Sequence, residues 1–245
     1  MINNKFFIFT SAGDNTNFDK LWIGDNMTYD IYVIYYGDNS GNYNNYKDKV
    51  KYIEKRKGSK FQNFHFFYHN YKEIIDKYER FFILDDDIIF TVNDINKMFD
   101  ISEKYNLSIC GPSFTHNSKI GHPISKNKKR FFLAYTNFIE VNTPLFSKAA
   151  LDKFMPYLDP CLIGWGIDYL YIWANGLNEK RAYAIIHNVY CENPKDDKKN
   201  NIRELTILKN FKSRSATWAS YSKKIGCPRH YHLTVYLWLD KDINT

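Results

Sequence analysis

The sequence has little cysteine, proline or glycine: 4, 7 and 11 residues in a chain of 245. The cysteines, at positions 110, 161, 191 and 227, are widely spaced and include no Cys-x-x-Cys pair. This spacing disfavours a zinc site and a disulfide framework, and favours reduced thiols. Because no stretch rich in Pro, Gly and Ser divides the chain, we predict one domain over residues 1–245. Its core would span about residues 5–193, and a C-terminal helical extension residues 202–240.

Long hydrophobic runs are also missing. No run approaches the roughly 20 apolar residues that a membrane-spanning helix needs. The first residues, Met1–Lys5, lack the apolar segment of a secretory signal. We therefore expect a soluble cytoplasmic protein without a membrane span.

The charge is positive, with a formal value of +7 and a pI near 9.0, and aromatic residues make up 18% of the chain. A basic protein favours a polyanionic ligand. Charge alone does not choose between nucleotide phosphates and nucleic acid.

Apolar patterns alternate between the strand period and the helix period along most of the chain. We predict strands at Phe6–Phe9, Ile31–Tyr36, Phe64–Tyr68, Phe81–Leu84, Leu107–Cys110, Phe131–Val141 and Ala182–Ile186. We predict helices at Tyr46–Lys55, Tyr71–Tyr78, Val92–Tyr105, Leu145–Met155, Ile167–Ala174 and Ile202–Ser222, and a helix or strand at Tyr231–Leu239. Strands and helices in alternation indicate an α/β fold with a mostly parallel sheet flanked by helices.

Three consecutive carboxylates, Asp85, Asp86 and Asp87, interrupt the apolar run from Phe81 to Phe90. In an extended chain Asp85 and Asp87 share one side, and Asp86 points away. Two carboxylates at the end of a buried strand repel each other unless a cation lies between them. Oxygen ligands of this kind suit Mg²⁺ or Mn²⁺. A solvated acidic turn is the alternative for an isolated Asp-x-Asp.

Other polar residues follow predicted strands or begin a predicted helix. Thr10, Ser11 and Ala12 follow the first strand, where open α/β sheets receive nucleotides, although an ordinary turn has the same pattern. Asp168 lies in the first turn of a helix, after the turn Gly164-Trp165-Gly166. Such an acid also simply favours the helix dipole. His187 follows the last core strand, where a structural role is the alternative.

Three segments in this order resemble the GT-A fold of nucleotide-sugar-dependent glycosyltransferases: Ile83–Asp87, Asn137–Ser147 and Gly164–Tyr169. The order is similar in particular to the plant and bacterial DUF707 group and to GT-A domains of large DNA viruses that infect algae. The similarity spans roughly residues 5–193. For a viral member, the location would be the host cytoplasm.

The resemblance implies a role for each matching residue. Asp87 would bind the cation that bridges the donor diphosphate, and Asp85 and Asp86 would hold that cation through water or contact the ribose. His187 takes the position of a late metal-ligand histidine, so the implied metal ligands are Asp85, Asp87 and His187. Thr10, Ser11 and Ala12 would line the base and ribose site.

Asp168 corresponds to the acid that faces the acceptor, and in inverting members it is the general base. If Asp168 only orients the acceptor, a retaining mechanism is the alternative. The implied cofactor is Mn²⁺ or Mg²⁺. The implied partners are a nucleotide-diphosphate sugar, above all a UDP-sugar, and a glycan acceptor, with no nucleic acid.

Two rival functions share parts of these patterns. A metal-dependent phosphohydrolase would use Asp85 as nucleophile and Asp87 as the assisting acid. That motif normally lies on the first strand, whereas here other strands precede it. A basic nucleic-acid-binding domain would stack bases on exposed aromatic rings. Most aromatic residues here, however, lie in apolar patterns that predict a core position.

Overall fold

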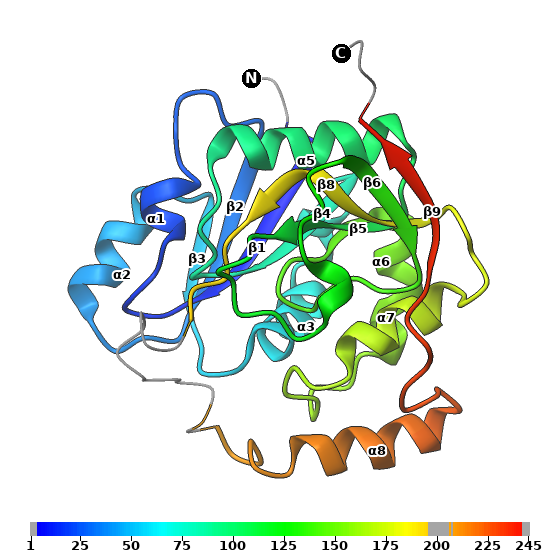
Figure 1. Cartoon of the computed structure of the whole chain (residues 1–245). Coiled ribbons are helices and arrows are strands. Elements are labelled where there is room, and N and C mark those ends of the chain that lie inside the picture. Colours follow the sequence, from blue (N-terminus) through cyan, green and yellow to red (C-terminus); the bar gives the residue numbers. More distant parts are fainter. Residues whose placement is uncertain (1–3, 196–205, 207, 242–245) are drawn as a thin grey trace.

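A computed structural model describes residues 4–195, 206 and 208–241. Nine strands form one sheet in the order β3-β2-β1-β4-β7-β5-β8-β6-β9 (Figure 1). The strands are β1 (Phe6–Ala12), β2 (Tyr29–Tyr35), β3 (Tyr52–Lys55), β4 (Arg80–Asp85), β5 (Ile109–Phe114), β6 (Phe131–Thr136), β7 (Leu145–Ser147), β8 (Tyr183–Cys191) and β9 (Val235–Asp240).

Most strands run in the same direction. β1, β2, β3 and β4 are parallel to one another. β7 lies antiparallel between β4 and β5, β8 is parallel to β5, and β6 is antiparallel to β8 and β9. The carboxyl ends of β1, β2, β4, β5 and β8 therefore lie along one edge of the sheet. This arrangement confirms the predicted α/β fold with a mixed, mostly parallel sheet.

Helices cover both faces of the sheet (Figure 1). They are α1 (Phe18–Leu21), α2 (Ser40–Lys47), α3 (Lys60–Asn70), α4 (Lys72–Ile75), α5 (Val92–Lys104), α6 (Lys148–Phe154), α7 (Ile167–Asn175) and α8 (Arg214–Ile225), with short 3₁₀ turns at Pro123–Ser125 and Met155–Tyr157. Alternate strand residues divide the core: Phe7, Phe9 and Phe81 pack with α3, α6 and α7. Ile8 and Phe82 pack on the other face with α1, α2 and α5.

Two predictions between β2 and β4 are wrong. The segment predicted as a helix at Tyr46–Lys55 contains the end of α2 and then β3, because Tyr52 and Ile53 pair with Tyr32 and Val33 at the sheet edge. The segment predicted as a strand at 64–68 lies inside α3. Ser59 and Gln62 form a capping box that starts this helix, and a short apolar run does not distinguish a strand from a buried helix.

Other boundaries also differ from the predictions. The helix predicted at Tyr71–Tyr78 is only the single turn α4, and the strand predicted at Phe131–Val141 ends at Thr136. The helix predicted from Leu145 begins instead at Lys148. Residues 145–147 fill the space between β4 and β5 as β7, and the Ser147 hydroxyl accepts from the Ala150 N–H as the helix cap.

The C-terminal part of the chain combines a helix and a strand. Part of the predicted helix Ile202–Ser222, residues 202–205 and 207, lies outside the described residues. Over residues 208–222 the chain is helical from Arg214, as α8, which packs through Trp218 on the core. The segment predicted as a helix or strand at Tyr231–Leu239 forms β9, which pairs with β6 at the sheet edge. Within the described ranges, no helix is long and apolar enough to cross a bilayer.

Candidate functional site

The acidic triplet lies at the carboxyl end of β4. Asp85 is the last residue of the strand, and Asp86 and Asp87 form the turn that follows. Ser11 of β1 pairs with Asp85 in parallel register. The segment predicted to bind a nucleotide and the segment predicted to bind a cation therefore lie side by side.

Asp85 forms an ion pair with Lys60, the first residue of α3. The Lys60 Nζ lies 2.8 Å from Asp85 Oδ1. The same ammonium donates to the carbonyls of Val141 at 2.8 Å, Asn142 at 2.9 Å and Ile83 at 3.1 Å. Burial lowers the pKa of Lys60, and the Asp85 carboxylate opposes this shift. Lys60 therefore joins β4 to the segment before β7.

The other two acids contact the loop after β1. The Asp86 Oδ2 accepts a hydrogen bond from the Gly13 N–H at 2.8 Å. The Asp87 carbonyl accepts from the Asn17 amide at 2.6 Å. Asp86 thus faces the β1 loop while Asp85 faces α3, as the alternation of an extended strand predicts.

The segment predicted to bind the nucleotide, residues 10–12, is packed inside the protein. Thr10, Ser11 and Ala12 are buried, and the Ser11 hydroxyl accepts from the Asn63 amide of α3 at 3.0 Å. The Thr10 hydroxyl is buried without a hydrogen-bond partner. Ala12 pairs with Tyr35 at the end of β2.

A cavity of about 230 Å³ opens at the carboxyl ends of β2 and β3. It is lined by Tyr35, Gly37, Asp38, Lys55, Arg56 and Lys57. Lys57 forms an ion pair with Asp38 at 2.7 Å. With three basic residues on its wall, the cavity suits an anionic ligand.

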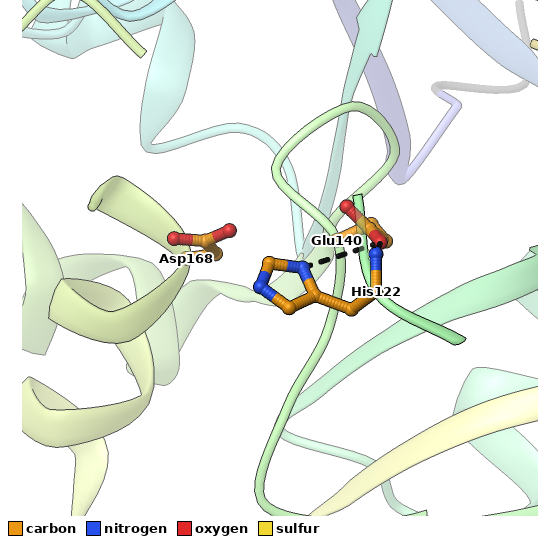
Figure 2. A group of neighbouring side chains, drawn as sticks. All are labelled: His122, Glu140 and Asp168. Atoms are coloured by element: carbon orange, nitrogen blue, oxygen red, sulfur yellow. Dashed lines mark hydrogen bonds and ion pairs between the residues drawn. The ribbon is translucent and has the colours of Figure 1, made fainter. Parts of the chain in front are cut away.

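A second group of polar side chains brings together His122, Glu140 and Asp168 (Figure 2). His122 precedes the 3₁₀ turn at Pro123–Ser125, Glu140 lies in the segment after β6, and Asp168 is in the first turn of α7. One nitrogen or oxygen atom from each side chain lies within 4.8 Å of the others. Glu140 and Asp168 are buried, with exposed fractions of 5% and 6%.

Glu140 is held by donors of the protein. Its Oε1 accepts from the His122 N–H at 2.8 Å and from the Ser125 hydroxyl at 3.3 Å. The His122 Nδ1 lies 3.5 Å from the same oxygen. The Glu140 carboxylate raises the pKa of His122, although burial opposes this shift. These three residue types can ligate a metal, but Glu140 Oε1 is already occupied by protein donors.

Asp168 has a higher proton affinity than an ordinary aspartate. Burial, followed by the charge of Glu140, raises its pKa to about 7. His122 opposes this shift, as does the Tyr169 N–H, which donates to Asp168 Oδ1 at 3.0 Å. A carboxylate with this pKa can accept a proton near neutral pH. The chemical requirement for the predicted base is therefore met, while its role stays a prediction.

The His122–Glu140–Asp168 cluster is connected to the acidic triplet through the backbone. The Asp85 N–H donates to the Asn142 carbonyl at 3.0 Å. Glu140 lies two residues before Asn142, and two residues of extended chain span at most about 7 Å. The two groups of carboxylates therefore share one region at the carboxyl edge of β4.

The turn before α7 exposes an aromatic ring. Gly164 and Gly166 have φ angles of +71° and +81°, in the left-handed region that favours glycine. Trp165 between them is 44% exposed, and the Arg214 guanidinium lies 5.3 Å from its ring centroid. A Cβ atom on Gly166 would lie 2.2 Å from the ring of Trp218. The turn thus presents Trp165 to solvent, three residues before Asp168 in the sequence.

His187 lies elsewhere in the sheet. The strand predicted to end at Ile186 continues to Cys191, so His187 is inside β8 and not at its carboxyl end. β8 is three positions from β4, which corresponds to roughly 14 Å between the strands. The His187 ring stacks on Trp238 of β9, on the side away from β4, and its Nδ1 accepts from the Lys128 N–H at 3.2 Å. Burial lowers the pKa of His187 to about 4.

The sequence interpretation missed Lys60, Glu140 and the role of His122. In the sequence, Lys60 ends a stretch rich in Asn, Lys and Tyr, and His122 stands in the polar, basic stretch 113–130. The one available signal for Glu140 was a carboxylate inside an otherwise apolar segment, Phe138–Val141. Each of these contacts joins residues distant in the sequence, so local patterns do not reveal it.

Solved structures with a similar fold include two glycosyltransferases. S. aureus TarS 1–349 in complex with UDP-GlcNAc has a TM-score of 0.57 and 10% identity, over 90% of this chain and 66% of that chain. The mannosyltransferase PcManGT from Pyrobaculum calidifontis in complex with GDP-Man and Mn²⁺ has a TM-score of 0.52 and 11% identity, over 94% of this chain and 66% of that chain. At these identities the likeness shows the fold alone.

The chain spans less than two thirds of the length of S. aureus TarS 1–349, and 42% of a longer TarS chain that matches with a TM-score of 0.54. No family model and no curated protein matches the sequence. The likeness to these glycosyltransferase structures supports the GT-A-like fold. The resemblance to the DUF707 group and to the domains of algal viruses stays a prediction.

Proposed function

We propose that this protein is a metal-dependent glycosyltransferase, of hexosyltransferase type, that moves a sugar from a nucleotide-diphosphate sugar to an acceptor hydroxyl. The observation that carries the proposal is the proximity of two carboxylate groups. The Asp85–Asn142 hydrogen bond connects the acidic triplet to the segment that carries Glu140, and Glu140 lies in one cluster with the buried Asp168. The solved proteins of similar fold include one bound to UDP-GlcNAc and one bound to GDP-Man and Mn²⁺, which supports the same class of donor.

The donor would bind along β1, β2 and β4. Thr10, Ser11 and Ala12 form the floor of the proposed nucleotide site, and Asp86 fixes the loop that follows through Gly13. We expect the base and ribose of a UDP-sugar beside this loop. The neighbouring acids then face the diphosphate.

The residues at the end of β4 fit a hard divalent cation. The Asp85 side chain is 34% exposed although one of its oxygens contacts Lys60, so the carboxylate reaches the solvent side of the site. Asp85 and Asp87 offer only oxygen ligands, which suit Mn²⁺ or Mg²⁺. Such an ion stabilises the negative charge that develops on a leaving diphosphate. We do not include His187 in the proposed ligand set, because it lies three strands away.

Asp168 is the proposed general base. It takes the proton of the acceptor hydroxyl, and the acceptor oxygen uses the released electron pair to form a bond to the anomeric carbon. The bond from that carbon to the donor phosphate oxygen breaks, and the nucleoside diphosphate leaves with that electron pair. One displacement of this kind inverts the anomeric configuration. Trp165 is the proposed platform for an acceptor sugar, since its ring is exposed in the turn that leads into the helix of Asp168.

The first test measures thermal unfolding with UDP, GDP, other nucleoside diphosphates and their sugars, each with and without Mn²⁺. A ligand that binds only the native state raises the unfolding midpoint by mass action, so the acceptor need not be known. We expect one nucleotide class, UDP first, to raise the midpoint in a Mn²⁺-dependent manner. The absence of any Mn²⁺-dependent shift across the panel would contradict the proposal and favour the phosphohydrolase. In a transfer assay, NMR of the product distinguishes inversion from retention.

A further inference from the structure

The His122–Glu140–Asp168 cluster poses an electrostatic problem that the proposed base alone does not solve. Two carboxylates are buried within 4.8 Å of the same imidazole. Burying two like charges together is strongly unfavourable unless a positive charge lies between them or one of them is protonated. The arrangement in Figure 2 places the His122 ring between Glu140 and Asp168. Its protonation state therefore determines the charge that Asp168 carries.

We propose that His122, Glu140 and Asp168 form one proton-sharing unit, in which Glu140 holds His122 as an imidazolium and this imidazolium keeps Asp168 ionised as the base. The inference rests on the proposed function, since it assigns two positioning residues to the same site. Neither His122 nor Glu140 exchanges a proton with the acceptor. They act through Asp168.

The geometry of Glu140 supports a fixed and charged partner for His122. Oε1 receives the backbone N–H of His122 and the hydroxyl of Ser125, so the carboxylate does not rotate freely. The imidazole Nδ1 lies 3.5 Å from this oxygen. The opposite ring nitrogen, Nε2, lies 3.4 Å from the Tyr169 hydroxyl. The ring of His122 thus lies between Glu140 and Tyr169, and Glu140 acts on it through its charge, because Nδ1 has no hydrogen-bond partner in the described structure.

In the described part of the chain, the other titratable groups that act on Asp168 are tyrosine side chains. The phenols of Tyr169, Tyr171 and Tyr231 all have a raised pKa, chiefly from burial, so they are neutral at physiological pH. His230 contacts the ring of Tyr169, with 5.2 Å between the ring centroids. His122 and Glu140 are thus the charged groups that tune Asp168.

The test is an NMR titration of the His122 ring in the whole protein, with the His122 signal assigned from its absence in His122→Asn. The key variant is Glu140→Gln, because the glutamine oxygen can still accept both hydrogen bonds and only the charge is lost. We expect the proton affinity of His122 to fall by about tenfold or more, one pKa unit. Asp168→Asn should lower it in the same direction. Glu54→Gln, which removes a carboxylate on β3, should leave it unchanged.

Two results would overturn the inference. One is an unchanged His122 titration in Glu140→Gln when circular dichroism shows a native fold. The other is tight binding of Mn²⁺ or Zn²⁺ that perturbs the His122 signal in the wild type and not in Glu140→Gln, since the cluster would then be a metal site. The titration uses no donor or acceptor, so its failure is distinguishable from failure of the proposed function. If the thermal test shows donor binding but the His122 titration does not depend on Glu140, the proton-sharing unit is contradicted and the proposed function is not.

Discussion

Lys60 and Asp85 form an ion pair in which the lysine is buried and the aspartate is partly exposed. The Lys60 side chain is 9% exposed and that of Asp85 is 34% exposed. The ammonium group also lies within hydrogen-bond distance of three backbone carbonyls, so its three hydrogens are shared among four acceptors. Lys60 thereby sets the position of Asp85 and of the segment that carries Glu140. The stability of the fold and the geometry of the site depend on the same side chain.

We expect Lys60→Met to destabilise the protein by about 2–4 kcal/mol. The substitution leaves Asp85 without its partner and the carbonyls of Val141 and Asn142 without a donor. The matched control is Lys72→Met, because the Lys72–Asp76 pair is exposed on both sides and should contribute less than about 1 kcal/mol. Urea unfolding measures both free energies. Equal effects of the two substitutions would show that Lys60 has no special structural role.

Asp87→Ala should abolish Mn²⁺-dependent nucleotide binding and leave the unliganded protein folded. The reason is that Asp87 lies in the turn after β4 and its carboxylate is not part of the apolar core. Isothermal titration with the nucleotide identified in the thermal test measures the loss. Asp100→Ala, which removes an exposed carboxylate from α5, is the control for net charge. An unchanged nucleotide affinity in Asp87→Ala would remove this residue from the cation site.

Asp168→Asn should retain donor binding and lose transfer, because asparagine cannot take the acceptor proton. The transfer rate of the wild type should fall as pH drops below about 7, where Asp168 becomes protonated. Initial rates over a pH series, with donor affinity measured in parallel, test both statements. Full transfer activity in the asparagine variant would exclude Asp168 from the mechanism.

The same substitution should stabilise the protein at alkaline pH. The pKa of Asp168 rises from its ordinary value of 3.8 to about 7 on folding, so between these values the folded chain binds a proton that the unfolded chain does not. Stability is therefore lost as pH rises through this window. We expect Asp168→Asn to raise the unfolding midpoint by roughly 4–8 °C at pH 8, equivalent to about 2 kcal/mol, and much less at pH 4. Equal midpoint changes at the two pH values would contradict the raised pKa.

Alanine substitutions at the two glycines beside Trp165 separate the cost of backbone strain from the cost of a steric clash. Gly164→Ala should cost about 1–2 kcal/mol, since its φ is +71° and a Cβ there meets nothing within 4 Å. Gly166→Ala carries similar strain and adds the contact with the Trp218 ring, so its cost should be greater by about 1–3 kcal/mol. Chemical denaturation of the pair gives the difference. Similar costs would mean that Trp218 moves aside without penalty.

Local sequence patterns predicted the parts of the fold that are locally determined. β1, β4 and α5 were predicted because continuous apolar runs or a regular helical stripe mark them. The prediction failed for β3 and β7. Both are short, and what makes each a strand is the neighbouring strand with which it pairs. A single-sequence pattern carries no information about that neighbour.

The candidate site also has residues that local sequence patterns predict and residues that they do not. The Asp85–Asp87 triplet and Asp168 stand out because carboxylates interrupt apolar segments or begin a helix. The sequence also suggested that Asp85 and Asp86 face different ways, and the structure agrees. The partners Lys60, Glu140 and His122 come from a helix, a loop and a turn that are far apart in the sequence. Their convergence is a property of the sheet order and of the antiparallel β7.

The position of Trp218 beneath Gly166 has a practical consequence for any shortened form of the protein. Trp218 donates from its indole nitrogen to the Arg229 carbonyl, so the region after β8 holds this ring against the turn that carries Trp165. The same C-terminal part of the chain contains β9, which pairs with β6 at the sheet edge. A chain ended at residue 193, where the sequence similarity ends, would expose the unpaired edge of β6 and remove the support for this turn. Loss of activity in such a truncation would therefore report aggregation or an unsupported loop, and would say nothing about the chemistry of the residues that remain.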